Sequence, residues 1–206
     1  MTDDTTQLMH RVSEGDEQAL MVVFVRYRER LKRMVRLRMD RRVQQRIDVS
    51  DVLQEAYLDV AKRAPEYLAK PDMDLFLWLR WLTGERLLAI HRRHLGTQKR
   101  DVAKDIAIHR GAIPHAASAS LAAQLLGHLT NPGDAAIRAE LQLKLQDVLN
   151  NMDEIDREVL VLRHFEELTN NEVASVLNIH KAAASNRYKR ALMRLKDILV
   201  QIPGFL

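Results

Sequence analysis

TNNEVASVLNIHKAAASNRYKRALMRLK, the stretch from Thr169 to Lys196, decides the fold of this 206-residue chain. Thr169 and Glu172 have the spacing of a capping box, in which each side chain accepts a hydrogen bond from the backbone N–H of the other residue. The box predicts a short helix that ends at Leu177, and a turn at residues 178–179 leads directly into a second helix. Two helices joined by so short a turn are typical of a helix-turn-helix.

The second helix of this pair has two different faces. Tyr188, Ala191 and Leu195 share a face with Ala184 and are predicted to pack against the first helix. The opposite face has small residues at its N-terminal end and longer ones further along: Ala182, Asn186, Lys189, Arg190 and Met193. Such a face suits the major groove of DNA, because the backbone can approach closely while long side chains reach base edges or phosphates.

The predicted DNA contacts come from this second helix. Asn186 suits an adenine edge and Arg190 suits a guanine or a phosphate, so binding is expected to weaken steeply with salt. The alternative is an ordinary solvated basic face on a helical hairpin. The predicted set consists of Lys181, Ser185, Asn186, Arg187, Lys189 and Arg190.

Composition predicts an all-helical, cytosolic protein. Hydrophobic residues make up 47% of the chain but aromatic residues only 5%, a mixture that favours helices over strands. The absence of cysteine excludes disulfides and thiolate metal sites. The first seven residues are polar and acidic, and no run of roughly 18 apolar residues occurs, so neither secretion nor membrane insertion is expected.

Charge is segregated along the chain, although the net charge is only +4. Residues 26–46 contain ten Arg or Lys residues against two acids, and residues 181–196 contain six bases and no acid. Residues 48–59 contain four acids and no base. The protein is therefore expected to present both basic and acidic surfaces to its partners.

Helical spacing of the apolar residues predicts an all-α fold with two small helical domains joined by a flexible linker. In residues 1–95, helices are expected after Asp16, from residue 48 or 50, and from residue 72 or 74 to about 93, with Pro65 and Pro71 bracketing a connector. Residues 96–135 hold four of the seven glycines and two of the five prolines, which indicates a linker with at most weak helices. Residues 136–206 form the second domain, in which a helix capped by Asp153 precedes the helix-turn-helix.

The order of these features resembles bacterial RNA polymerase sigma factors of the extracytoplasmic-function group. The C-terminal part of the resemblance runs from Asn151-Met152-Asp153 through Glu172-Val173-Ala174 and Leu177-Asn178-Ile179 to residues 187–191. The N-terminal part is an acidic D-x-x-D-x-x-Q-E helix with Tyr57-Leu58, followed by Trp78-Leu79 and Arg92-Arg93. The match covers most of the chain outside the linker, and these features rarely coincide in this order.

The resemblance implies an alternative sigma factor, which is not an enzyme and needs no cofactor or metal. Such a protein binds core RNA polymerase and directs promoter recognition and transcription initiation. Its first domain would bind the polymerase and melt the minus-10 element of promoter DNA, and its helix-turn-helix domain would recognise the minus-35 element. The acidic helix would dock on the clamp coiled coil of the largest polymerase subunit through Asp48, Asp51, Gln54 and Glu55. An anti-sigma factor is a usual further partner in the family.

Minus-10 contacts are expected on the third helix, which combines aromatic and basic residues in the way that single-strand binding requires. The residues are Trp78, Arg80, Trp81, Arg86, Arg92 and Arg93. Alternatively, at least one of the two tryptophans belongs to the core. In the family the preceding loop, here Glu66 to Asp74, also recognises unpaired bases. The chain departs from the family pattern at His180, which replaces a capping hydroxyl, and at Glu85, where a polar Asn is typical.

Two other functional classes fit parts of the sequence. A helix-turn-helix transcription regulator with an N-terminal sensing or dimerisation domain would explain the C-terminal half equally well. A metal-dependent helical enzyme is suggested by His91 and His94, with His109, His115 and His128 nearby in sequence. No Asp or Glu joins the first two histidines at ligand spacing, and no phosphate-binding glycine loop is present, so the sequence does not favour an enzyme.

Overall fold

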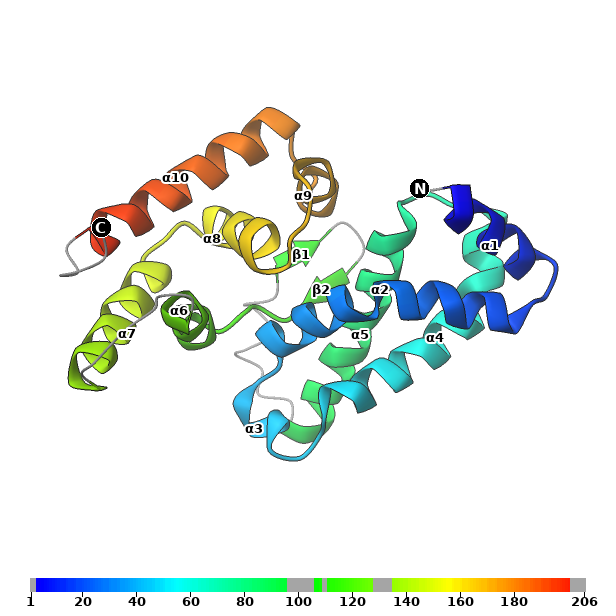
Figure 1. Cartoon of the computed structure of the whole chain (residues 1–206), viewed down its shortest axis with the longest axis horizontal. Coiled ribbons are helices and arrows are strands. Elements are labelled where there is room, and N and C mark those ends of the chain that lie inside the picture. Colours follow the sequence, from blue (N-terminus) through cyan, green and yellow to red (C-terminus); the bar gives the residue numbers. More distant parts are fainter. Residues whose placement is uncertain (1–2, 96–105, 109–110, 128–134, 201–206) are drawn as a thin grey trace. The chain divides into compact units, whose positions relative to one another are not determined.

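The computed structural model of the chain describes residues 3–95, 106–108, 111–127 and 135–200 (Figure 1). The chain divides into two compact units, Met1–Pro114 and His115–Leu206. Helices form nearly all the regular structure of the described residues, which confirms the all-α class; the exception is one short antiparallel ribbon. Within these residues, no helix combines the length and the apolar character needed to cross a membrane.

The first unit contains a long helix at each of the three predicted places. Its helices are α1 (Asp3–Ser13), α2 (Glu17–Arg38), α3 (Arg41–Gln44), α4 (Val49–Ala69) and α5 (Leu75–Leu95). The Asp16 carboxylate accepts a hydrogen bond from the Ala19 N–H at 3.0 Å and caps α2, whereas Asp48 caps α4. Short polar side chains that satisfy the first N–H groups thus fix where these helices begin.

Helix α4 continues through Pro65, where the sequence predicts a connector between Pro65 and Pro71. Proline removes one helical hydrogen bond, to the carbonyl four residues earlier, which here belongs to Ala61. Both Pro65 and Ala61 are exposed, so water can solvate the carbonyl that loses its partner. The local sequence does not reveal that the proline lies on the outer side of the helix.

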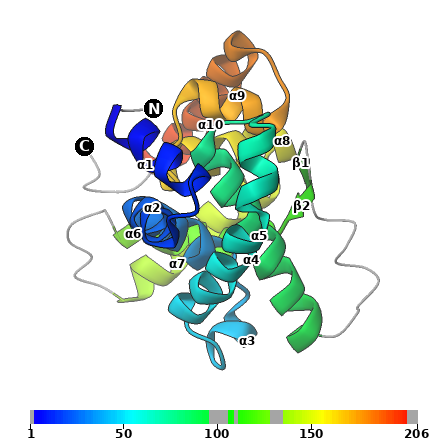
Figure 2. The same ribbon diagram turned by 90° about the vertical axis from the view of Figure 1, so that its right-hand side faces the viewer.

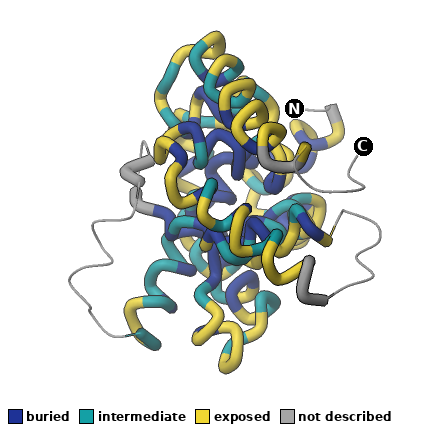
Figure 3. The backbone as a smooth tube through the Cα atoms, turned by 90° about the vertical axis from the view of Figure 1, so that its left-hand side faces the viewer, coloured by how far each residue is buried: buried dark blue, intermediate teal, exposed yellow. Residues whose placement is uncertain are grey.

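The core of the first unit lies where α2, α4 and α5 pack together. Buried and exposed positions alternate along these helices, as expected for amphipathic helices (Figure 3). Leu31, Val52 and Leu79 each contribute a fully buried side chain from a different one of the three helices. An aromatic pair, Tyr67 and Trp78, closes one end of the α4–α5 contact with ring centroids 4.4 Å apart.

The segment expected to be a linker, residues 96–135, contains regular structure in its described part. Strands β1 (Ile106–Ile108) and β2 (Gly111–Ile113) pair antiparallel, and β2 lies beside α5 (Figure 2). Ile113 is buried against Gly84, at which a Cβ atom would come within 2.6 Å of the Ile113 side chain. Arg38 also donates a hydrogen bond to the Pro114 carbonyl at 2.9 Å. These long-range contacts, which composition does not reveal, join residues 113–114 to the first unit.

The second unit begins with α6 (Ser118–Gly127), which also falls within the expected linker and packs against α7 (Ala135–Asn150). Next come α8 (Glu154–Leu160), a π-helical turn (Val161–Phe165), α9 (Asn170–Leu177) and α10 (Lys181–Leu199). Helix α10 contacts α7, α8 and α9. Its buried positions are Ala184, Ala191 and Leu195, which belong to the face predicted to pack inward.

His91 makes the stability of the first unit sensitive to pH. Its Nε2 atom accepts a hydrogen bond from the Asp40 backbone N–H at 3.2 Å, which requires a neutral ring. Burial lowers the pKa of His91 below its ordinary value of 6.5; Asp40 acts to raise the pKa and Arg42 to lower it. The folded state therefore binds fewer protons than the unfolded state around this pH, so stability falls on acidification.

We expect the free energy of unfolding to decrease as the pH falls from 7.5 through 6.5 to 5.5. His91→Gln keeps a hydrogen-bond acceptor but cannot titrate, and should remove this part of the dependence. Urea unfolding of the full chain at each pH measures the effect. His10→Gln is the control, because His10 is exposed. Identical pH profiles for wild type and His91→Gln would contradict the assignment.

Candidate functional site

The α9–α10 pair forms the predicted helix-turn-helix. Thr169 and Glu172 make the capping box at the start of α9, and Asn178 adopts the left-handed conformation that ends this helix. The Asn170 side chain donates a hydrogen bond to the Lys181 carbonyl at 2.9 Å and lies 3.4 Å from the Ser185 hydroxyl. Side-chain contacts therefore hold the first turns of α10 against α9.

The outward face of α10 carries most of the predicted minus-35 residues. Lys181, Asn186, Lys189 and Arg190 are exposed, and Ser185 is half-buried beside Asn170. Exposed Ala182 at the N-terminal end leaves space for the backbone to approach another surface. The arrangement matches what a helix needs in order to enter a major groove.

Arg187 and Arg190 of α10 are held by carboxylates of α8. The Arg187 guanidinium lies 2.7 Å from an Asp156 oxygen and 3.1 Å from an Asp153 oxygen. Arg190 donates to the same Asp156 oxygen at 3.1 Å. Asp153 also caps α8, and hydrogen bonds from that helix's backbone keep the pKa of Asp153 below its usual value. Arg187 is thus engaged inside the second unit rather than extended toward solvent.

The predicted minus-10 residues of α5 fall into three structural groups. Trp78 and Arg80 are buried, Trp81 is half-buried, and Arg92 and Arg93 are exposed. Trp78 is stacked on Tyr67, so the possibility that one tryptophan belongs to the core applies to this residue. The Arg63 guanidinium covers the Trp81 ring at 4.5 Å from its centroid. In this conformation Trp78 is buried and stacked, and Arg63 covers one face of the Trp81 ring.

A small recess of about 150 Å³ adjoins the two tryptophans. It includes part of the predicted recognition loop and is lined by Arg63, Glu66, Tyr67, Lys70, Asp72, Trp78 and Trp81. The indole N–H of Trp81 is buried and has no hydrogen-bond partner among the described residues. Sequence reasoning missed Arg63, because its part in this recess depends on how α4 packs against α5, and it included Tyr67 only as a member of the loop Glu66 to Asp74.

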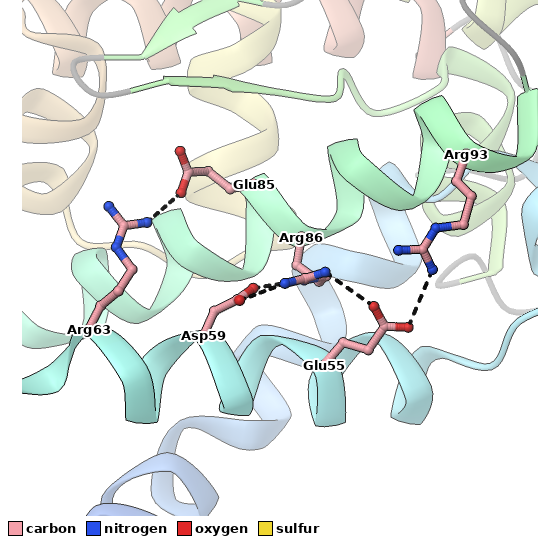
Figure 4. A network of polar contacts seen from close by, with 6 residues as sticks. All are labelled: Glu55, Asp59, Arg63, Glu85, Arg86 and Arg93. Carbon is pink, nitrogen blue, oxygen red and sulfur yellow. Dashed lines mark hydrogen bonds and ion pairs between the residues drawn. The ribbon is translucent and has the colours of Figure 1, made fainter.

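Arg86 joins α5 to α4 and does not project freely toward solvent (Figure 4). Its guanidinium donates two hydrogen bonds to Asp59, at 2.5 and 2.7 Å, and a third to Glu55 at 3.3 Å. The hydrogen bonds to Asp59 are the main cause of a raised pKa for Arg86. Arg93 lies 4.0 Å from Glu55, and Arg63 pairs with Glu85 at 2.8 Å. Acids of α4 therefore partly neutralise bases of α5.

The predicted polymerase-binding residues differ in exposure and in the hydrogen bonds that their side chains already make within the first unit. The Asp48 and Asp51 carboxylates form the capping box of α4, and the backbone N–H of Ser50 is the main cause of a lowered pKa for Asp48. Gln54 is exposed. Glu55 is half-buried and engaged by Arg86, so the exposed residues of this set are Asp48, Asp51 and Gln54.

An apolar groove lies beside these polar residues, between α2 and α4. Its volume is about 490 Å³ and its lining consists of Met21, Phe24, Val25, Arg28, Ser50, Leu53, Gln54, Tyr57 and Leu58. The Leu58 side chain is 66% exposed, and Val25 and Met21 are also open to solvent. Sequence reasoning did not single out Met21 or Val25. The available signal was that these apolar residues lie outside the inward stripe of α2.

The described residues contain no group of three or more potential metal ligands of the His, Cys, Asp or Glu type. His91 instead accepts a backbone hydrogen bond. His109 and His128, which were part of the metal-enzyme alternative, lie outside the described residues.

Comparison with known protein families finds a match within the second unit. Residues 142–195 match the family described as Sigma-70, region 4, and this match runs from within α7 through α8 and α9 to most of α10. Among solved structures, the chain is similar to CnrH, solved in complex with the cytosolic domain of CnrY. The TM-score is 0.56 at 19% identity, and the likeness covers 97% of this chain and 99% of that chain. No curated protein sequence matches the chain.

The α9–α10 pair therefore belongs to a DNA-binding helix-turn-helix of the sigma-70 region 4 class. The likeness to CnrH shows that the chain shares the fold of that protein over nearly its whole length. The region 4 match and this shared fold agree with the resemblance to sigma factors of the extracytoplasmic-function group that the sequence predicts.

Removing the Arg86 side chain should weaken the first unit. Arg86→Ala leaves Asp59 without its partner, and hydrogen bonds to charged groups contribute roughly 1–3 kcal/mol. We expect a decrease of about that size in the free energy of unfolding, measured by urea titration of the full chain. Arg92→Ala, which removes an exposed arginine from the same helix, should change stability by less than about 0.5 kcal/mol. Equal effects of the two changes would show that Arg86 has no structural role.

Proposed function

We propose that this chain is a sigma factor of the extracytoplasmic-function group, directs transcription initiation, and binds core RNA polymerase through the α2–α4 groove and the polar residues beside it. The observation that carries the proposal is a groove that combines exposed Met21, Val25 and Leu58 with Gln54, while exposed Asp51 lies three residues before Gln54 on the same side of α4. Exposed apolar side chains grouped in a groove mark a protein interface more often than scattered ones do. The clamp coiled coil of the largest polymerase subunit, which is basic where it meets sigma factors, is the proposed occupant.

The polar rim of this groove supports the same partner. Asp51 is exposed and suits a basic surface, and Gln54 can both donate and accept hydrogen bonds. Asp48, like Asp51, is exposed although its carboxylate belongs to the capping box, and Glu55 contributes at the edge because Arg86 engages it. An apolar centre with a polar rim is the usual composition of a specific protein interface.

For promoter DNA, we propose that α10 binds the minus-35 element through Lys181, Ser185, Asn186, Lys189 and Arg190. We propose that residues 136–206 act as the minus-35 domain, residues 1–95 as the polymerase and minus-10 domain, and residues 96–135 as the connection. Arg187 supports this surface from behind, because its guanidinium is bound to Asp156. Six bases without an acid in residues 181–196 favour an anionic partner.

The minus-10 element is proposed to contact the recess beside Trp81 together with exposed Arg92 and Arg93. The recess is lined by aromatic side chains, the basic Arg63 and Lys70, and the acidic Asp72, a mixture that can receive one unpaired base through aromatic contacts and hydrogen bonds. Trp78 and Arg80 act there only by shaping the core beneath, since both are buried.

An inhibitory protein partner is a further part of the proposal. The solved CnrH structure contains the cytosolic domain of CnrY. A partner of comparable kind would act on this chain by covering the surfaces proposed for polymerase or DNA, which are the α2–α4 groove and the outward face of α10.

The polymerase proposal predicts that Leu58→Lys weakens binding to core RNA polymerase by at least about tenfold, the effect of removing an interface contact worth roughly 1.4 kcal/mol. Leu58 is 66% exposed, so the change should leave the fold intact. Leu143→Lys is the matched control, because Leu143 in α7 is 67% exposed and lies outside the groove. Fluorescence titration with core enzyme measures affinity, and run-off transcription over a promoter library measures function. Failure of the wild-type chain to bind core enzyme would overturn the proposal.

The minus-35 proposal predicts different results for two neighbouring side chains. Asn186→Ala should cost roughly 1–3 kcal/mol of discrimination at one base position of the upstream element. Lys189→Ala should weaken binding about equally for all sequences and reduce the slope of log affinity against log salt by about 1. Lys144→Ala in α7 removes an exposed base from the same unit and is the control. Promoter-library selection with reconstituted holoenzyme provides the measurement, and unchanged preferences for Asn186→Ala would remove it from the base-reading set.

A further inference from the structure

Asp156 is the one aspartate among the described residues of the second unit that is buried, and both of its close partners lie on the recognition helix. Its side chain is 4% exposed, whereas Arg187 is 26% and Arg190 is 58% exposed. The Asp156 Oδ1 atom accepts hydrogen bonds from Arg187 at 2.7 Å and from Arg190 at 3.1 Å. A carboxylate withdrawn from water to this degree requires charged partners, so the two contacts are coupled to folding.

The geometry of these contacts constrains the rotation of α10 about its own axis. Arg187 and Arg190 are three residues apart and therefore project from the same side of the helix on successive turns. Asp153 adds a second carboxylate against Arg187 at 3.1 Å and is itself fixed as the N-cap of α8. A rotation or shift of α10 would stretch both arginine contacts at once.

These contacts also leave some basic residues of α10 available to a partner and engage others within the protein. Arg187 shares one guanidinium nitrogen between two carboxylates, and so it is held away from the outward face. Arg190 uses its Nη2 atom on Asp156, and the remaining guanidinium donors of this more exposed side chain stay available. Asn186 and Lys189 are exposed and have no hydrogen bond to these acids.

We infer that Asp156 is a positioning residue that sets the promoter preference of this sigma factor, although it does not itself touch DNA. It withholds Arg187 from phosphates and fixes the direction from which Arg190 reaches the upstream element. The inference rests on the proposed binding of minus-35 DNA by α10. Without the carboxylate, both arginines become mobile cations, which bind any phosphate backbone and carry little sequence information.

The test compares wild type with Asp156→Asn, which keeps the size of the side chain and removes its charge. Full-length chain reconstituted with core RNA polymerase is used to select from a pool of duplexes with a randomised upstream element. Binding is then measured for the most enriched duplex and for a duplex with that element scrambled, over a range of salt concentrations. Glu140→Gln is the matched control, because it removes one negative charge from an exposed site of the same unit.

For Asp156→Asn we expect the ratio of affinities for enriched and scrambled duplexes to fall at least about fivefold, mainly because the scrambled duplex binds more tightly. The slope of log affinity against log salt should steepen by about 1 for one new phosphate contact. Adding Arg187→Met to Asp156→Asn should return the slope to the wild-type value. If Asp156 had a purely structural role, Asp156→Asn would lower the unfolding temperature, and adding Arg187→Met would not restore the salt slope. All binding is therefore measured well below the unfolding transition.

Unchanged discrimination and salt slope in a folded Asp156→Asn protein would overturn the inference. If that variant does not fold, Arg187→Lys takes its place, since lysine keeps the charge but replaces the planar guanidinium that contacts Asp153 and Asp156 with a strongly hydrated ammonium on a flexible stem. It should show the same fall in discrimination, and wild-type discrimination in Arg187→Lys would equally overturn the inference. Failure of wild-type holoenzyme to enrich any upstream sequence would instead refute the underlying minus-35 proposal.

Discussion

Pairing of arginines with carboxylates from a neighbouring helix is the interaction on which both units depend. In the first unit, Arg86 of α5 is bound by Asp59 and Glu55 of α4. In the second, Arg187 of α10 is bound by Asp156 and Asp153 of α8. The surrounding packing is apolar and has little directional preference, whereas hydrogen-bonded ion pairs fix orientation. These pairs therefore align the helices that carry the DNA-facing residues.

The same pairing explains why a chain with many basic residues can have selective surfaces. A basic helix with every cation extended would bind any nucleic acid, because phosphate contacts carry no sequence information. In α5 and α10, carboxylates engage some arginines, while Arg92 in α5 and Lys189 in α10 remain exposed. The carboxylates of one helix thus determine which basic side chains of the neighbouring helix are available at the surface.

Sequence reasoning predicted the helices well where the signal was local. The caps at Asp16 and Asp48 and the capping box of Thr169 and Glu172 depend on neighbouring residues and are present. The ribbon containing Ile113 depends on a distant partner, Gly84, and was not predicted. Helix continuation through Pro65 depends on exposure to solvent, which only the packed structure defines.

For the candidate site, sequence predicted residue types more reliably than their exposure. Trp78 and Arg187 have the chemistry expected of nucleic-acid contacts, but Trp78 stacks on Tyr67, and Arg187 binds Asp156. The partner residue in each case lies more than ten residues away in sequence, so no local pattern predicts the contact. Conversely, Met21 and Val25 look like ordinary helix residues until the groove beside Gln54 places them at the surface.

The α2–α4 groove and the charged pairs have opposite consequences for the unbound protein. Exposed Met21, Val25 and Leu58 gain nothing from folding, and their contact with water is unfavourable until a partner covers them. The bound arginines, in contrast, are already satisfied before any DNA arrives. The fold therefore leaves apolar side chains uncovered in the groove proposed for polymerase, whereas it already restrains part of the basic side chains on the surfaces proposed for DNA.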